Sequence, residues 1–184
     1  MKKKIGPFTE VSRETKYRND WMYVEEARVI RPDKSLGVFG LVYMRSGTTV
    51  VALDNSKNVF LVKEFKYAVN RYTVELISGA IEDAENPIDA GIRELREETG
   101  YTADKVTYLG VIDPFTTVIS SQNHIILAEG LHHQPMPMPT SDGDVVEPFK
   151  VPFSTALQMI ETGELTHGAS CVALLRTARR LQFH

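Results

Sequence analysis

One stretch of the sequence gathers acidic side chains at intervals that suit metal-assisted chemistry. It reads GAIEDAENPIDAGIRELREETGY and runs from residue 79 to residue 101. Three of its acids fall within one expected helical turn: Glu94, Glu97 and Glu98. Carboxylates that close repel one another, and a hard divalent cation removes the conflict because it prefers oxygen ligands. The spacing therefore predicts a metal site that shares its ion with substrate phosphates and activates water.

The three acids are predicted to lie on one helix. Asn86 followed by Pro87 is typical of a helix N-cap and first helical residue, and Gly100 is typical of the residue just past a helix end. We therefore predict a helix over about residues 87–99. At roughly 100° per residue, the acids lie nearly opposite a stripe that consists of Ile88, Ile92, Leu95 and Thr99. One face should enter a core while the other displays the carboxylates.

Residues around the acids are predicted to support them. Glu85 precedes the helix and can pair with Arg93, which would brace the loop against the helix. Gly79 lets the backbone turn tightly or approach a ligand closely. The alternative for a helix rich in Glu and Arg is a solvated face stabilised by pairs four residues apart. The long spaced pattern, on a loop followed by a helix, favours catalysis over that alternative.

The pattern G-x5-E-x7-R-E-U-x-E-E-x-G-U, with U a bulky apolar residue, resembles the Nudix box. That box is the signature of hydrolases that cut diphosphates linking a nucleoside to another moiety. Every fixed polar and glycine position is matched, and Tyr101 stands where the family usually has an aliphatic residue, so we expect it to serve packing. The resemblance implies that Mg²⁺ or Mn²⁺ is held by the backbone carbonyl of Ser78 and by Glu94, Glu97 and Glu98. It also assigns Glu97, Glu98, Arg93 and Glu85 to the catalytic machinery.

The flanks of the box resemble one subgroup, the ADP-ribose and nucleoside diphosphate sugar pyrophosphatases. The resemblance lies in the segments 59–69, 73–79, 109–114 and 156–175. It departs at residues 115–117, where Phe-Thr-Thr replaces a Gly-containing turn, and Pro114 comes slightly early. The subgroup implies hydrolysis of the diphosphate bond in substrates such as ADP-ribose. The products would be a nucleoside monophosphate and a sugar phosphate.

The same resemblance implies a general base on a later loop. Asp142, Asp144 and Glu147 are the candidates, and the alternative is that they are ordinary turn residues, because Asp-Gly is a common turn pair. The loop around them, residues 131–144, is rich in proline, as a mobile flap is expected to be.

Substrate contacts are predicted by analogy. Lys66 stands where the subgroup often has an arginine, so we expect it to contact a phosphate without the fork geometry of a guanidinium. Arg71 and Glu75 are predicted to contact ribose or phosphate, and Gly79 to lie beside the substrate. Trp21, or Tyr23 in the same arm, is predicted to stack on the nucleobase. The alternative for Trp21 is packing in the core or at a dimer interface.

The order of the expected elements predicts the fold class. Strands are expected at residues 21–30, 37–43, 48–53, 59–65, 72–77, 106–112, 124–128 and 145–151, the last at a sheet edge because it contains Pro148. Two helices follow. The first is capped by Ser154, and the second covers about residues 168–182 with Val172, Leu175 and Ala178 inward. This order predicts an α/β protein, a Nudix-type α/β/α sandwich around a mixed sheet. We expect a single domain of 184 residues, with an N-terminal β arm over about 1–46 that forms a homodimer and a catalytic core over about 47–184.

Composition excludes several classes of function. The net charge of −3 argues against a general nucleic-acid surface. No apolar run is long enough to span a bilayer, and residues 5–8 do not form a signal-peptide apolar region. Cys171 is the single cysteine, so no internal disulfide is possible, and the cytoplasm is the expected location.

Two alternative functions stay open at the level of sequence. The first is a Nudix hydrolase of nucleoside triphosphates or dinucleoside polyphosphates, which would use the same box. The second is a ligand-binding regulator that has lost catalysis, which the intact box argues against.

Overall fold

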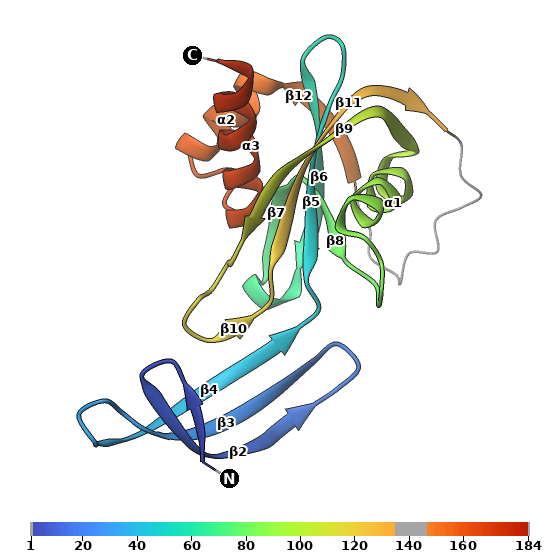
Figure 1. The fold of residues 1–184 in the computed structure, drawn as a ribbon. Coiled ribbons are helices and arrows are strands. Elements are labelled where there is room, and N and C mark those ends of the chain that lie inside the picture. Colours follow the sequence, from blue (N-terminus) through green and yellow to red (C-terminus); the bar gives the residue numbers. More distant parts are fainter. Residues whose placement is uncertain (1, 135–146, 184) are drawn as a thin grey trace. The chain divides into compact units, whose positions relative to one another are not determined.

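The computed structural model describes residues 2–134 and 147–183, and the chain divides into two compact units (Figure 1). Unit 1 comprises Met1–Arg45 and Asp113–Gln122, and unit 2 comprises Ser46–Ile112 and Asn123–His184. Among the described residues, no helix is long and apolar enough to cross a membrane.

Unit 1 is a five-stranded sheet in the order β1-β2-β3-β4-β10. Adjacent strands of this sheet run antiparallel, except that β10 runs parallel to β4. The strands are β1 (Lys3–Ile5), β2 (Phe8–Arg18), β3 (Met22–Ile30), β4 (Leu36–Met44) and β10 (Ile119–Ser120). The predicted strands over 21–30 and 37–43 are confirmed as β3 and β4, whereas β1, β2 and β10 were not predicted. That the first 46 residues form a dimerising arm stays a prediction.

Unit 2 contains the larger sheet, in the order β12-β6-β5-β11-β9, with β7 also paired to β6 and β8 to β5. The strands are β5 (Gly47–Leu53), β6 (Asn58–Lys66), β7 (Arg71–Glu75), β8 (Ile77–Ala80), β9 (Tyr101–Ile112), β11 (Asn123–His133) and β12 (Glu147–Pro152), and a 3-10 turn, η1 (Tyr67–Val69), joins β6 to β7. Strands β5 and β11 run parallel and the other pairs are antiparallel, so the sheet is mixed. Strand β12, which contains Pro148, lies at an edge as predicted.

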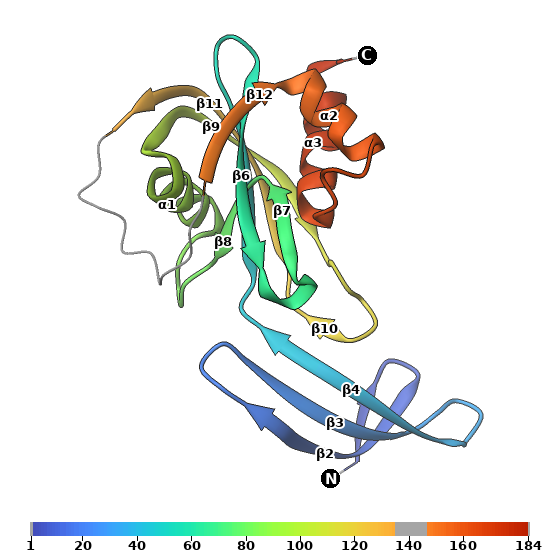
Figure 2. The same ribbon diagram turned by 180° about the vertical axis from the view of Figure 1, so that it is seen from behind.

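The sheet of unit 2 has a helical layer on each face (Figures 1 and 2). Helix α1 (Pro87–Thr99) packs on one face, and α2 (Phe153–Glu161) and α3 (Gly168–Leu181) pack on the other. The central strand β5 serves both cores, because Val50 faces the α1 side and Val51 faces the α2 and α3 side. Both side chains are fully buried, as expected for a strand covered on both faces. The predicted α/β sandwich is confirmed.

Two details of the C-terminal helices differ from prediction. Helix α2 begins at Phe153, and its N-cap is Pro152, so the prediction that Ser154 caps it is wrong. On α3, the predicted inward position of Leu175 is also wrong, because that side chain is 54% exposed while Leu174 is fully buried. The buried face of α3 is formed by Leu174 and by small residues such as Ala173 and Ala178, and Leu175 lies off that face.

Candidate active site

The box forms a loop followed by a helix, as predicted. Asn86 accepts a hydrogen bond from the backbone N–H of Ile88 at 2.9 Å, and Pro87 is the first residue of α1. The helix ends at Thr99, followed by Gly100 in the left-handed conformation with φ of 72°. Local signals thus fix both ends of the helix that carries the acids.

The Arg93 side chain forms hydrogen bonds with several residues of the box. Its Nε lies 2.9 Å from Oε1 of Glu85 and its Nη2 lies 3.0 Å from Oε2, so the predicted pair is a two-pronged one. Nη2 also donates to the carbonyl of Ala80 at 2.9 Å. Nη1 lies 2.7 Å from Oε1 of Glu94 and 3.1 Å from Oε2 of Glu97. Arg93 therefore ties the loop before α1 to two of the three acids, and the sequence had predicted only its bond to Glu85.

These contacts perturb the acids in opposite directions. The hydrogen bond from Arg93 lowers the pKa of Glu85. Burial raises the pKa of Glu94, even though Arg93 opposes that shift. Burial, together with the negative charges of Glu94 and Glu64, raises the pKa of Glu98 to about 8. The site therefore crowds negative charge into a partly buried space around Glu98.

The donor set fits a hard divalent cation. Oε2 of Glu98 is buried without a hydrogen-bond partner among the described residues, and the backbone N–H of Ser78 donates to the same carboxyl group. Within residues 2–134 and 147–183, no three His, Cys, Asp or Glu side chains are already arranged as a metal cage. Arg93 engages one oxygen of Glu94 and one oxygen of Glu97. Each of these carboxylates keeps a second oxygen that Arg93 does not contact, and a cation bound there would relieve the crowding that raises the pKa of Glu98.

Gly79 lies against Glu94. A Cβ atom at Gly79 would be 2.0 Å from the carboxyl carbon of Glu94, far inside any normal contact. A side chain at this position would displace that carboxylate from where it lies. The predicted close approach of the backbone is therefore to an acid of the box, and whether Gly79 also contacts substrate stays a prediction.

Glu64 is a nearby acid that the sequence analysis missed. Its Oε2 accepts a hydrogen bond from Nζ of Lys66 at 2.5 Å. Burial lowers the pKa of Lys66, and the bond to Glu64, together with other nearby carboxylates that include Glu98, more than offsets this, so the pKa lies above its ordinary value. The structure thus brings Lys66 into the electrostatic field of the box, with Glu64 beside it. The signal available in the sequence was the short run Lys-Glu-Phe-Lys at residues 63–66.

Glu75 is more enclosed than a substrate contact needs to be. Its side chain is buried, with Oε1 accepting from Thr73 Oγ1 at 2.8 Å and Oε2 lying 3.3 Å from Nδ1 of His167. The same Nδ1 lies 2.8 Å from Oγ of Ser170, which in turn accepts from the backbone N–H of Leu76 at 2.9 Å. This network joins β7 to the start of α3, and no sequence signal had pointed to it.

Other predicted contacts lie at the surface. Arg71 is exposed and donates to Thr166 Oγ1 at 3.0 Å. Glu147, the first residue of β12, is exposed. Asp142 and Asp144 lie outside the described residues. Tyr101 packs beside Phe60, with 5.0 Å between ring centroids, which confirms its packing role.

Trp21 lies in unit 1 and is 65% exposed, so it does not pack in the core of that unit. It lines a hollow of about 350 Å³ together with Arg18, Tyr23 and Tyr43. The rings of Tyr23 and Tyr43 are stacked with centroids 4.5 Å apart, and the guanidinium of Arg18 lies 4.8 Å from the centroid of Tyr23. The hollow offers an aromatic and cationic surface that suits a flat, electron-rich ring.

Comparisons with known proteins agree with this geometry. The family model described as the NUDIX domain matches residues 44–166. The ADP-ribose pyrophosphatase of Bacillus subtilis (strain 168) is 28% identical over 153 residues, which cover 83% of this chain and 82% of that protein. The GDP-mannose pyrophosphatase of Shigella flexneri is 28% identical over 145 residues, which cover 72% of this chain and 74% of that protein. These relatives confirm the predicted resemblance to the nucleoside diphosphate sugar pyrophosphatase subgroup.

A solved structure supports the fold. It is described as the crystal structure of an ADP compounds hydrolase, and it matches 98% of this chain and 97% of its own with a TM-score of 0.83 and 20% sequence identity. The family model alone spans more than half of the chain. This protein belongs to the Nudix family and is a pyrophosphohydrolase.

Proposed function

We propose that this protein hydrolyses the diphosphate bond of nucleoside diphosphate sugars such as ADP-ribose in a reaction that depends on Mg²⁺ or Mn²⁺. The observation that carries the metal dependence is the buried, unpartnered oxygen of Glu98 within a crowd of carboxylates. The similarity to ADP-ribose pyrophosphatase supports the substrate class. The products would be a nucleoside monophosphate, AMP for ADP-ribose, and a sugar phosphate.

In this proposal Glu94, Glu97 and Glu98, with the carbonyl of Ser78, hold the cation. A bound divalent ion would polarise a phosphoryl oxygen and lower the pKa of a water molecule. Arg93 keeps Glu85 and the helix in register through its two-pronged bond, so the acids stay aligned. Glu147, or Asp142 or Asp144, would take a proton from the attacking water.

Substrate binding in this proposal draws on cationic and aromatic groups. Lys66 would face a phosphate, since its ammonium already interacts with the charge of Glu98. Arg71 would contact ribose or phosphate, and Glu75 would act by fixing its neighbours because it is buried. The exposed Trp21 would stack on the nucleobase. We also propose a cytoplasmic homodimer in which the N-terminal arm forms the interface.

A substrate panel with product analysis tests the substrate class. ADP-ribose, ADP-glucose, GDP-mannose, UDP-glucose, ATP and a dinucleoside polyphosphate would be incubated with Mg²⁺ and with Mn²⁺. We expect a nucleoside monophosphate and a sugar phosphate from the sugar substrates. Release of pyrophosphate from ATP as the dominant reaction would instead favour the alternative of a triphosphate or dinucleoside polyphosphate hydrolase.

The metal site is tested by isosteric replacement. Glu97→Gln and Glu98→Gln should each lower turnover by orders of magnitude, because one carboxylate ligand and its charge are lost together. Glu161→Gln is the matched control, since Glu161 is exposed on α2, on the other face of the sheet. Mn²⁺ binding followed by electron paramagnetic resonance should weaken in Glu98→Gln and not in Glu161→Gln. Unchanged turnover in both box variants would refute the assignment.

A further inference from the structure

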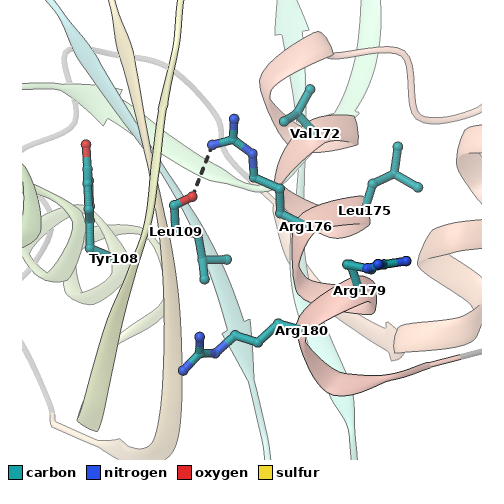
Figure 3. Close-up of a pocket in the computed structure, with 7 residues that line it drawn as sticks. All are labelled: Tyr108, Leu109, Val172, Leu175, Arg176, Arg179 and Arg180. Atoms are coloured by element: carbon teal, nitrogen blue, oxygen red, sulfur yellow. Dashed lines mark hydrogen bonds between the residues drawn. The ribbon is translucent and has the colours of Figure 1, made fainter.

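A groove of about 630 Å³ runs between α3 and the edge strand β9 of unit 2 (Figure 3). It lies on the sheet face that α2 and α3 cover, opposite to the box helix α1. Its walls include Leu109 on the strand, and Val172, Leu175, Arg176 and Arg180 on the helix. Apolar and cationic side chains thus line one groove that the box chemistry does not use.

Arg176 is held across this groove by the strand. Its Nη1 donates to the carbonyl of Leu109 at 3.1 Å and its Nη2 donates to the carbonyl of Val111 at 3.4 Å. The strand is bulged here, because Tyr108 pairs with Ile126 and Gly110 with Ile125, which leaves Leu109 without a cross-strand partner. A guanidinium has five N–H donors, so three of them remain for a ligand after these two bonds. The bulge therefore presents a fixed cation with spare donors.

A second cation reaches toward the same space. Arg180 follows Arg176 by four residues, and Figure 3 shows both side chains extended from α3 toward the strand. Like charges at this spacing repel. Among the described residues, no Asp or Glu side chain forms an ion pair with Arg176, Arg179 or Arg180. An anion bound in the groove beside either guanidinium group would reduce this repulsion.

The helix end explains only part of the arrangement. Positive charge in the last turn of a helix is favourable, and Arg179 and Arg180 lie in the last turn of α3. Arg176 lies before that turn and is directed across the groove by the strand carbonyls. The neighbouring Leu175 is 54% exposed, which adds an apolar wall beside the cations. The groove therefore suits a ligand with an anionic end and an apolar body.

An added peptide strand fits the groove less well than a small molecule does. Strand addition needs free carbonyls on the edge, and Arg176 already occupies those of Leu109 and Val111. The volume lies within the range of small-molecule sites, about 300–1,000 Å³. Forked guanidinium donors match phosphate oxygens. We propose that this groove binds a phosphorylated small molecule with an apolar part, of about the size of a nucleoside monophosphate.

The test uses amide and arginine Nε–H signals of the full-length protein in EDTA, titrated with AMP, adenosine or inorganic phosphate. EDTA removes metal, so binding of AMP at the box is minimised. Any signal changes that remain on α1 are distinguished from those on α3 and β9 because the signals belong to different residues. We expect AMP to shift the groove signals with saturation, and adenosine and phosphate each to bind more weakly. Arg180→Gln should weaken AMP binding at least about tenfold, and Arg180→Lys should recover only part of it. Lys57→Gln, an exposed cation in the β5–β6 turn, is the charge-matched control and should bind as the unaltered chain does.

The outcomes separate clearly. Shifts confined to α1, or equal losses in Arg180→Gln and Lys57→Gln, would overturn the groove site. Phosphate binding as tightly as AMP would overturn the apolar part of the proposal. Turnover of ADP-ribose by Arg180→Gln with Mg²⁺ should be unchanged. Failure of the groove site therefore leaves the proposed function intact, and failure of the proposed function leaves the groove site intact.

Discussion

Gly91 of α1 lies so close to Ile126 of β11 that a Cβ atom on Gly91 would be 2.5 Å from Cδ1 of Ile126. The same atom would be 3.1 Å from Thr48 Oγ1 and 3.1 Å from Val50 Cγ2. All three neighbours are fully buried, so admitting the atom would force a shift within a close-packed core. The absence of a side chain at Gly91 thus sets how closely the box helix lies on the sheet.

Gly91→Ala should therefore destabilise the protein, although alanine favours helices. Overpacking of a dense core costs about 1–3 kcal/mol and the gain in helix propensity is about 1 kcal/mol, so we expect a net loss of up to about 2 kcal/mol. Urea unfolding measures the difference. Gly168→Ala is the control, because a Cβ atom there would meet nothing within 4 Å. A Gly91→Ala protein as stable as the Gly168→Ala protein would contradict this packing argument.

The N-cap of the box helix should contribute measurably to stability. Asn86→Ala removes the acceptor for the N–H of Ile88, and we expect a loss of about 0.5–2 kcal/mol. Asn86→Asp keeps an acceptor at the same place and should restore most of the loss. Thermal unfolding of the three proteins compares them. Equal stability of the Ala and Asp variants would show that the cap contributes nothing.

Arg93→Lys should slow catalysis without unfolding the protein. A lysine keeps the charge and loses the fork that grips both oxygens of Glu85. Because Arg93 positions the acids, we expect kcat to fall roughly 10–100-fold, as for other residues that orient metal ligands. Steady-state kinetics with ADP-ribose would measure kcat and KM separately. Arg28→Lys, at an exposed pair with Glu26, should leave both constants unchanged.

The stability of the protein should decrease as the pH is lowered, partly because of His167. Burial, with a contribution from the charge of Lys66, lowers the pKa of His167 despite the opposing charge of Glu75. In the unfolded chain the imidazole has its ordinary pKa of about 6.5. It therefore takes up a proton at a higher pH in the unfolded chain than in the folded chain. The stability that the neutral imidazole contributes is present above the unfolded pKa. It is lost as the pH falls below that pKa toward the lower pKa of the folded state.

His167→Gln should flatten this dependence. Unfolding free energies measured between pH 8 and pH 5, roughly across the unfolded pKa of histidine, should fall less steeply in the variant. His132→Gln, at an exposed position, is the control and should keep the steeper slope. Partial burial also lowers the pKa of His124, so that residue accounts for part of the slope that remains. Identical slopes for His167→Gln and the unaltered chain would remove His167 from the explanation.

The sequence predicted features that depend on local signals. Asn86, Pro87 and Gly100 act on their own neighbours, so the bounds of α1 agree with the prediction of residues 87–99. The pair of Glu85 and Arg93 follows from their places on either side of the helix start. The family resemblance rested on this same short stretch, and the family model confirms it.

Features that depend on distant contacts were missed. Strand β2 reads FTEVSRETKYR, in which few residues are apolar, so its strand state follows from pairing with β3. Glu64 and Glu98 are far apart in sequence, and only the packing of α1 on the sheet brings their charges together. Leu175 has the spacing of a core residue, yet the buried face of α3 runs through Leu174 and Ala173, and Leu175 is exposed.

The parallel pairing of β5 with β11 has a consequence for how the chain acquires its structure. Thr48 of the central strand bonds to the carbonyl of His124, 76 residues further along. Contacts between such distant segments slow folding, because a large loop must close before the pairing stabilises it. During synthesis β5 emerges long before its partner, so we expect its apolar surface to need shielding on the ribosome until β11 has been made.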